Sequence, residues 1–157
     1  NLLKVGLVWK GSHRHERDAW RSPGISGLKQ LLDVPGVHWV SIQKDDEIED
    51  LKSEGVSEGI MVLGNSFRNF SDTAAALANL DLVISPDTAV AHLAGALGIP
   101  VWVLIPHASD WRWLCDRSDS PWYPTMKLWR QPSAGNWQSV IEDLAVALQK
   151  HAFEIAQ

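Results

Sequence analysis

The sequence predicts an α/β fold: a Rossmann-like, doubly wound and mostly parallel sheet of about six strands with helices on both faces. Short apolar runs of strand length alternate with segments of helical period, which is typical of parallel βαβ units. The chain has 157 residues, of which 45% are hydrophobic, and this suits one domain with a sizeable core. We therefore expect residues 1–157 to form a single domain.

The first βα unit begins with an apolar strand at residues 3–9. A polar, charge-rich loop at residues 10–21 follows, and a helix is expected over residues 22–34. Pro23 suits the first turn of that helix, because the N–H that proline lacks would have no partner there.

The second unit combines a strand at residues 37–43 with a short acidic helix at residues 45–55. Gly55 marks the end of this helix, because glycine readily adopts the left-handed conformation at a helix C-terminus. A third strand is expected at residues 60–63.

The middle of the chain repeats the alternation. A helix over residues 73–80 is expected, with Ser71 or Asp72 as its cap, because short polar side chains satisfy the free N–H groups of a first turn. A strand at residues 82–85 follows, and then a helix over residues 88–97.

The last part of the chain begins with a strand at residues 101–105. A tryptophan-rich loop at residues 106–125 separates it from a last strand at residues 126–129, and a long amphipathic helix is expected from about residue 136 onward. In such sheets ligands bind at the carboxyl ends of the strands, so the loops that follow strands are the places to search.

Composition excludes several classes of protein. The formal net charge of −5 opposes a nucleic-acid surface, which needs clustered Lys and Arg, and no apolar run approaches the ~20 residues that span a bilayer. The single cysteine, Cys115, supports neither an internal disulfide nor a zinc site, so a cytoplasmic location is expected. Asn1 lies directly before an apolar strand, without an initiator Met or a leader, which suggests a fragment of something longer.

Residues 81–92, DLVISPDTAVAH, place a buried strand, a tight turn and a helix start in immediate succession. The free backbone N–H groups of Thr88, Ala89 and Val90 would point out of the helix start, where the helix dipole favours an anion. We therefore expect a diphosphate here, with Ser85 in the preceding turn also among the candidate binding residues.

Asp87 and His92 each have two interpretations. Asp87 either caps the helix with its own carboxylate, which we favour, or accepts hydroxyl groups of a sugar or ribose. His92 lies four residues after Thr88, on about the same helix face, so it could donate to a phosphate oxygen as a catalytic group. A packed histidine explains the same spacing almost as well.

At this point the chain resembles a known group. Residues 87–100, DTAVAHLAGALGIP, look like the signature of family 9 glycosyltransferases, the ADP-heptose heptosyltransferases. The chain is more similar still to the glycosyltransferase-like domains that follow tetratricopeptide repeats in many bacterial proteins, where the segments at 111–113 and 120–124 also occur. Heptosyltransferases usually have glycine where this chain has Ala89, which argues against ADP-heptose as the donor.

The resemblance implies the GT-B architecture of two Rossmann-like domains. The C-terminal one, matched by this chain, would bind a nucleotide-sugar donor without a metal or other cofactor. The missing N-terminal domain would lie before Asn1 and supply the acceptor site and the general base, and tetratricopeptide repeats are further expected partners. A membrane is expected only peripherally, if the acceptor is a glycolipid, and no nucleic acid is expected.

The loop at residues 10–22, KGSHRHERDAWRS, follows the first strand and so opens on the same edge of the sheet as Thr88. A positioned cation there would stabilise the charge that a leaving nucleoside diphosphate gains, and Arg21 is the first catalytic candidate. The repeat-linked domains carry a similar Gly-x-x-x-His-x-x-Asp-x-x-Arg-Ser pattern. The candidate binding residues of this loop are Lys10, Gly11, Ser12, His15, Arg17 and Ser22. A solvated loop of mixed charge is the alternative interpretation.

Two further features have open interpretations. Gln43 and the loop at residues 64–72 either flank a nucleobase pocket or are ordinary strand ends. The tryptophans at strands are expected to pack, whereas those of the long loop either stack on sugars or pack. The first set is Trp9, Trp39, Trp102 and Trp129, and the second is Trp111, Trp113 and Trp122.

The expected function is therefore donor binding within a metal-independent glycosyltransferase that acts by direct displacement, with the domain alone inactive. The alternative is a degenerate nucleotide-binding or scaffold domain attached to repeats. A metal site at His13 and His15 lacks a third ligand, so no metal is expected. A nicotinamide enzyme is disfavoured, because the Gly-x-Gly-x-x-Gly fingerprint is absent after the first strand.

Overall fold

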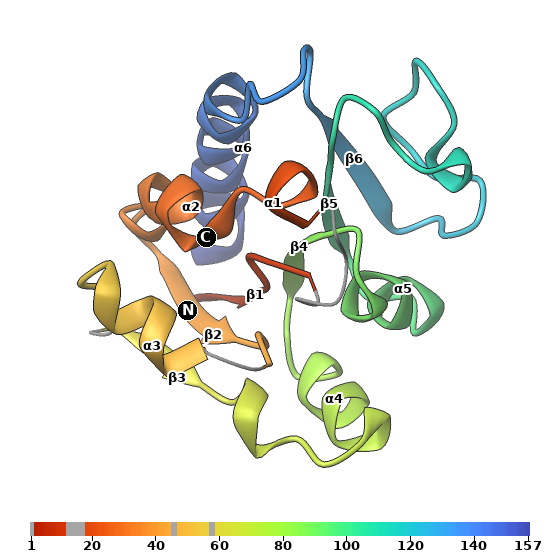
Figure 1. Cartoon of the computed structure of the whole chain (residues 1–157). Coiled ribbons are helices and arrows are strands. Elements are labelled where there is room, and N and C mark those ends of the chain that lie inside the picture. Colours follow the sequence, from red (N-terminus) through yellow and green to blue (C-terminus); the bar gives the residue numbers. More distant parts are fainter. Residues whose placement is uncertain (1, 12–17, 45–46, 57–58) are drawn as a thin grey trace.

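The computed structural model describes residues 2–11, 18–44, 47–56 and 59–157. Its centre is a six-stranded sheet of order β3-β2-β1-β4-β5-β6, in which every neighbouring pair of strands is parallel (Figure 1). The strands are β1 (Leu3–Leu7), β2 (Val37–Ser41), β3 (Ile60–Val62), β4 (Leu82–Pro86), β5 (Val101–Ile105) and β6 (Met126–Arg130). The predicted fold class is confirmed.

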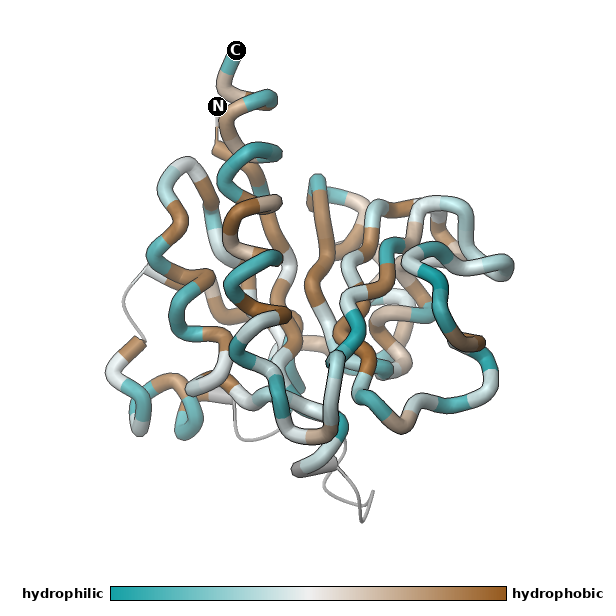
Figure 2. Tube along the Cα trace, turned by 90° about the horizontal axis from the view of Figure 1, so that it is seen from above, coloured by the Kyte–Doolittle hydropathy of each residue, from teal (hydrophilic) through white to brown (hydrophobic). Residues whose placement is uncertain are grey.

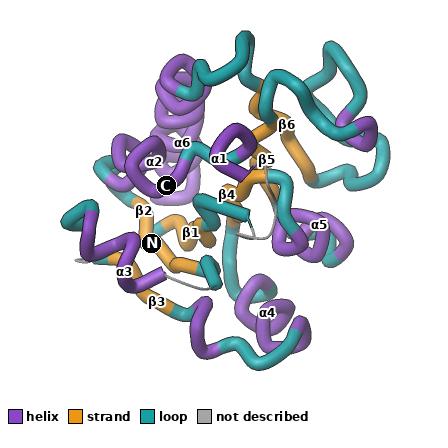
Figure 3. The backbone as a smooth tube through the Cα atoms, viewed as in Figure 1, coloured by secondary structure: helices purple, strands orange, loops and turns teal. Residues whose placement is uncertain are grey.

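Helices cover both faces of the sheet (Figure 3). They are α1 (Asp18–Arg21), α2 (Gly24–Leu32), α3 (Glu47–Ser53), α4 (Phe70–Leu77), α5 (Ala89–Ala96) and α6 (Gln138–Ala156), with single 3₁₀ turns η1 (Gly64–Ser66) and η2 (Trp111–Trp113). One hydrophobic core joins the sheet to α2, α3 and α6, and a second core joins its other face to α4 and α5. Hydrophobic and hydrophilic residues alternate along α6, the helix that leads to the C-terminus (Figure 2).

The order of the strands creates a switch point between β1 and β4. The chain builds β1, β2 and β3 outward in one direction, then returns to place β4 on the free side of β1 and continues outward to β6. The loops after β1 and β4 therefore diverge above the carboxyl ends of these strands. A crevice at such a point is the usual ligand site of a doubly wound sheet.

The start of α4 corrects the sequence prediction. The helix begins at Phe70 rather than at Thr73, and Asn69 caps it instead of Ser71 or Asp72. Asn69 has extended backbone angles, and its side-chain oxygen accepts from the N–H groups of Ser71 and Asp72 at 2.9 and 3.1 Å. A residue outside the helix with extended backbone can reach both donors, whereas residues inside the first turn supply them.

The strands β1 and β2 each end two residues earlier than predicted. The reason is a side chain: Oε1 of Gln43 accepts from the N–H groups of Trp9 and Lys10, both at 3.1 Å. These donors are therefore satisfied outside the sheet ladder, which stops at this point. The loop after β1 also holds the short helix α1, which the sequence did not predict.

Within the described ranges, none of the helices has the length and apolar character that crossing a membrane requires.

Candidate functional site

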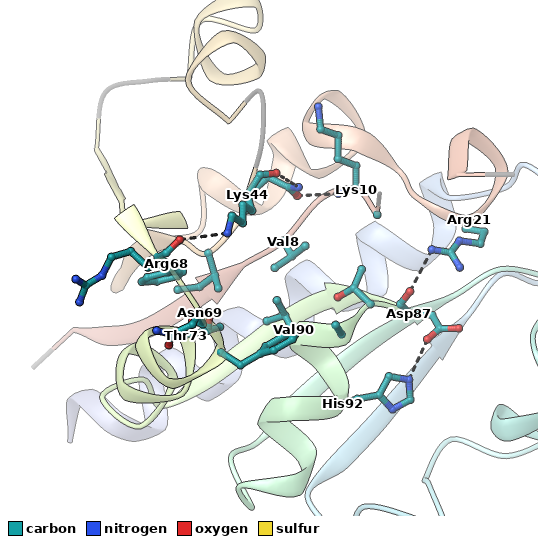
Figure 4. Close-up of a pocket in the computed structure, with 17 residues that line it drawn as sticks. Val8, Lys10, Arg21, Lys44, Arg68, Asn69, Thr73, Asp87, Val90 and His92 are labelled. Atoms are coloured by element: carbon teal, nitrogen blue, oxygen red, sulfur yellow. Dashed lines mark hydrogen bonds and ion pairs between the residues drawn. The ribbon is translucent and has the colours of Figure 1, made fainter. Parts of the chain in front are cut away.

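A cavity of about 710 Å³ opens at the carboxyl edge of the sheet, over the switch point between β1 and β4 (Figure 4). Its walls come from the segments that follow four consecutive strands, namely β1, β2, β3 and β4. The volume lies in the range of cavities that bind small molecules and cofactors. Nine of the predicted site residues line it: Lys10, Gly11, Arg21, Gln43, Asp87, Thr88, Ala89, Val90 and His92.

One end of the cavity is formed by the first turn of α5. Thr88 is the N-cap residue, with extended backbone angles, but its side chain makes no capping hydrogen bond. Instead, Oγ1 of Thr88 and Oγ of Ser85 lie 2.8 Å apart, and the Ser85 hydroxyl lies 2.8 Å from the Pro86 carbonyl, to which it donates. The first-turn N–H groups of α5 are thus left without a side-chain cap, and the helix dipole adds a partial positive charge.

Ser85 itself does not line the cavity. Its side chain is completely buried, and its hydroxyl shapes the turn between β4 and α5. Its predicted role in binding is therefore replaced by a structural one, because the strand places its side chain beneath the turn.

Asp87 is not the helix cap, so the favoured interpretation of this residue was wrong. Its Oδ1 lies 3.2 Å from Nε2 of His92, one turn into α5, and its carboxylate is 19% exposed. Burial by itself raises the pKa of Asp87, but hydrogen bonds from His92 and Trp113 and the charges of His92 and Arg21 outweigh it and hold the pKa below its ordinary value. Asp87 is therefore an ionised acceptor at the wall of the cavity.

His92 is held from three sides while it still lines the cavity. Its Nδ1 lies 3.2 Å from the hydroxyl of Tyr123, and its ring stacks on Trp113 with a centroid distance of 5.3 Å. Because the Asp87 carboxylate can only accept, Nε2 carries the proton, and in the neutral ring Nδ1 accepts from Tyr123. His92 thus behaves as the packed histidine of the sequence alternatives, and a contact with phosphate stays a prediction.

Gly95 explains how Tyr123 reaches His92. An added Cβ at Gly95 would lie 2.7 Å from Cγ of Tyr123 and 3.0 Å from Cε of Met126, distances that real side chains do not tolerate easily. The ring of Tyr123 therefore packs directly on the backbone of α5. This contact links the long loop after β5 to the cavity wall.

Arg21, at the end of α1, reaches the start of α5. Its Nη2 donates to the backbone carbonyl of Asp87 at 3.3 Å, and the side chain borders the cavity beside Asp87 (Figure 4). This contact places Arg21 at the same edge of the sheet as Thr88, where the loop after β1 was expected to open. The role of Arg21 in binding or catalysis stays a prediction.

Lys10 lines the cavity, but its ammonium group lies 2.6 Å from the carboxylate of Asp50 in α3. The same carboxylate accepts from Nε1 of Trp9 at 2.8 Å. Lys10 is thus paired with α3, and its contact with a phosphate stays a prediction.

Gln43 also lines the cavity without offering its amide to a ligand. Its oxygen accepts from Trp9 and Lys10, as described above, and its Nε2 donates to the carbonyl of Lys44 at 3.0 Å. The side chain is only 5% exposed. It ties the ends of β1 and β2 together, so the alternative of an ordinary strand end fits the structure better than a nucleobase reader.

The remaining predicted residues of the loop after β1 divide into two groups. Gly11 lines the cavity, and its N–H donates to Oγ of Ser22 at 3.3 Å. Ser22 is nearly buried and does not line the cavity, so it supports Gly11, and its contact with a ligand stays a prediction. Ser12, His15 and Arg17 lie outside the described residues, as does His13.

The far end of the cavity contains residues that the sequence identified only as a loop, or missed. Residues 67–70 of the loop at 64–72 form this wall together with Thr73 of α4, and Phe70 is 64% exposed there. Lys44 was missed, although its place directly after β2 could have indicated it, and its Nζ donates to the Phe67 carbonyl at 3.2 Å. This end therefore combines aromatic rings with the cations Lys44 and Arg68.

The tryptophans follow their predicted division. Trp9 and Trp39 are buried, and the rings of Trp102 and Trp129 pack with centroids 5.2 Å apart. Within the long loop, Trp113 is buried, whereas the two others, Trp111 and Trp122, are more than half exposed.

The chain is similar to known proteins in sequence and in fold. The model of glycosyltransferase family 9 (heptosyltransferase) matches residues 39–109, which include β4 and the start of α5. Protein FlbA of Caulobacter vibrioides is 34% identical over 95% of this chain, and the chain spans 25% of FlbA. The crystal structure of the glycosyl transferase family 9 from Veillonella parvula DSM 2008 superposes with a TM-score of 0.64 at 15% identity, over 96% of this chain and 46% of the other. The family model thus matches less than half of this chain, and the fold of the Veillonella structure is shared over nearly all of it.

Proposed function

We propose that this domain binds the nucleoside diphosphate of a sugar donor in the cavity and that it acts in glycosyl transfer without a metal. The observation that carries the proposal is the meeting of Arg21 with the uncapped first turn of α5 at one end of a 710 Å³ cavity. A helix start and a guanidinium group both favour a bound phosphate.

The nucleoside would occupy the other end of the cavity. There Phe67 and Phe70 supply aromatic surface, and Lys44 and Arg68 supply positive charge. Aromatic rings stack on nucleobases without strong preference for one base. The two ends lie on one continuous wall, so a nucleoside and its diphosphate can be bound together.

The chemistry would be direct displacement at the anomeric carbon of the donor. As the glycosidic bond breaks, the leaving diphosphate gains negative charge, and Arg21 with the N–H groups of Ala89 and Val90 would stabilise it more in the transition state than in the ground state. Asp87, which is held ionised, would accept hydroxyl groups beside the diphosphate.

The acceptor and the general base would come from another domain of a longer cytoplasmic protein. This proposal is supported by the share of the known proteins that the chain spans, 46% of the Veillonella enzyme and 25% of FlbA. Tetratricopeptide repeats, expected from the sequence resemblance, are proposed as a further part of that protein.

A second candidate function is a scaffold domain that has lost donor turnover. Ala89 favours it, because a methyl group is exposed at the start of α5, where heptosyltransferases usually have glycine. The two candidates differ in one property: only the first requires binding of a nucleotide that depends on its diphosphate.

The test is calorimetric titration of the chain with UDP, GDP and ADP and with the corresponding monophosphates. One diphosphate should bind saturably and more tightly than its monophosphate. Arg21→Ala should weaken that binding by roughly tenfold or more, because a charge-assisted hydrogen bond contributes about 1.5–3 kcal/mol.

Two further variants make the test specific. Ala89→Pro removes one first-turn N–H while suiting the helix start, because Thr88 already has the extended backbone that a following proline requires. This variant should weaken binding of the diphosphate by about threefold to tenfold and leave the affinity for the monophosphate almost unchanged. Arg117→Ala, which removes an exposed charge paired with Asp119 away from the cavity, is the matched control. Absence of binding by all the nucleotides would favour the scaffold function.

A further inference from the structure

A second cavity of about 490 Å³ adjoins the first one. Arg21 and Asp87 line both cavities, so the two share one wall. The rest of the second cavity is formed by residues 106–110 after β5, by the segment after β6, and by Trp20 at its rim. It therefore lies at the same carboxyl edge of the sheet, two strands further along.

Gln131 is the most informative residue of this second cavity. It directly follows β6 and is only 2% exposed, and its backbone N–H continues the sheet by donating to Ile105 at 2.9 Å. Its side-chain oxygen accepts from the N–H of His107 at 3.1 Å. Nε2 of the same amide has no hydrogen-bond partner among the residues that the structure describes. A buried polar group of this kind requires an explanation, and a ligand in the cavity provides one.

The other polar groups of the cavity extend this donor. Oγ of Ser109 accepts from Nη1 of Arg130 at 2.8 Å, which leaves its own proton to donate. Asp87 and Asp110 supply carboxylate oxygens, and Arg21 supplies guanidinium N–H groups. The cavity thus contains both donors and acceptors, which suits hydroxyl groups because each hydroxyl both donates and accepts.

We propose that the second cavity binds the sugar of the donor, with Nε2 of Gln131 donating to one of its hydroxyl oxygens. This inference rests on the proposed function, because it takes the diphosphate to lie at Arg21 and the start of α5. A sugar attached to that diphosphate leaves the first cavity at the shared wall of Arg21 and Asp87 and enters the second. Gln131 then determines which sugars are accepted, since a site that hydrogen-bonds a hydroxyl rejects sugars that lack it.

The experiment follows the side-chain amide resonance of Gln131 in ¹⁵N-labelled chain, assigned by its loss in Gln131→Met. The chain is titrated first with the preferred nucleoside diphosphate and then with its glucose, galactose, mannose and N-acetylglucosamine conjugates. The resonance should stay in place with the diphosphate alone and shift with at least one conjugate, which should also bind more tightly than the diphosphate. Gln131→Met should abolish the gain in affinity from the sugar, a change of about threefold to tenfold, and leave diphosphate affinity unchanged.

Two control variants distinguish loss of the sugar contact from a general effect of substitution on the fold or on diphosphate binding. Gln138→Met changes an exposed glutamine at the start of α6, outside both cavities, and should alter neither affinity. Ser109→Ala leaves Gln131 in place, and it should reduce the gain in affinity from the sugar by less than Gln131→Met does. If the diphosphate binds but no conjugate shifts the Gln131 amide, the inference is wrong while the proposed function stands. If no nucleotide binds, both are wrong.

Discussion

Replacing Gly95 by alanine tests whether the packing of Tyr123 on α5 supports the wall of the site. The new Cβ would lie 2.7 and 2.9 Å from ring atoms of Tyr123 and 3.0 Å from Cε of Met126, whereas ordinary contacts begin near 3.4 Å. Overpacking of this kind costs about 1–3 kcal/mol. The better helix propensity of alanine offsets up to about 1 kcal/mol of this cost, so we expect a net destabilisation of about 1 kcal/mol.

The assay is urea unfolding of the wild-type chain and Gly95→Ala, with thermal melts beside it. A loss of about 1 kcal/mol corresponds to a melting temperature lower by about 2–4 °C for a chain of this size. Gly27→Ala, in α2, is the comparison variant, because its Cβ would meet a single atom, Cβ of Pro23, at 3.0 Å, and it should therefore be destabilised less than Gly95→Ala. In a Tyr123→Ala background, Gly95→Ala should become stabilising, since the ring that it displaces is gone. A Gly95→Ala variant that is destabilised equally in both backgrounds would refute the contact.

Two other substitutions examine the same edge of the sheet. Asp87→Asn should lower stability at pH 7, and urea unfolding should show this deficit shrinking as the pH falls below about 3.9. The folded pKa is depressed, so the stability from the carboxylate is present above the unfolded pKa of about 3.9 and is lost as the pH falls through the lower folded pKa. A deficit that persists unchanged in acid would contradict the ionised carboxylate. Gly64→Ala should destabilise by more than about 2 kcal/mol in the same assay, because its Cβ would overlap the backbone carbonyl of Gln43, and a stable variant would show that the ends of β2 and β3 can separate.

The six strands could be predicted because buried parallel strands are short, continuous apolar runs. Val101–Ile105 was predicted at its exact bounds, since Pro100 and a polar loop flank it. The ends of β1 and β2 could not be predicted. They depend on Gln43, whose side chain replaces the backbone ladder across two segments separated by more than thirty residues.

In the site, too, features set by adjacent residues could be predicted, whereas contacts between residues far apart in the sequence could not. The helix start at Thr88 was predicted, because a strand, a turn and small helical residues are adjacent in the sequence. The contacts that Asp87 and Lys10 make were not predicted. Asp87 looks like a cap in the sequence, but the fold brings Trp113 and Arg21 to it, and Lys10 finds its partner in Asp50, forty residues later. Such pairs are tertiary contacts that no local pattern encodes.

The most direct test of the central claim is an amide ¹H–¹⁵N spectrum of the chain during titration with UDP, GDP and ADP. The claim is that the uncapped first turn of α5 binds a diphosphate, so the backbone N–H signals of Ala89 and Val90 should shift saturably with one of them, together with signals of residues 67–70 from the nucleoside end. The corresponding monophosphate should shift residues 67–70 with little change at Ala89. Saturable shifts that spare Ala89 and Val90 with every diphosphate would contradict the claim.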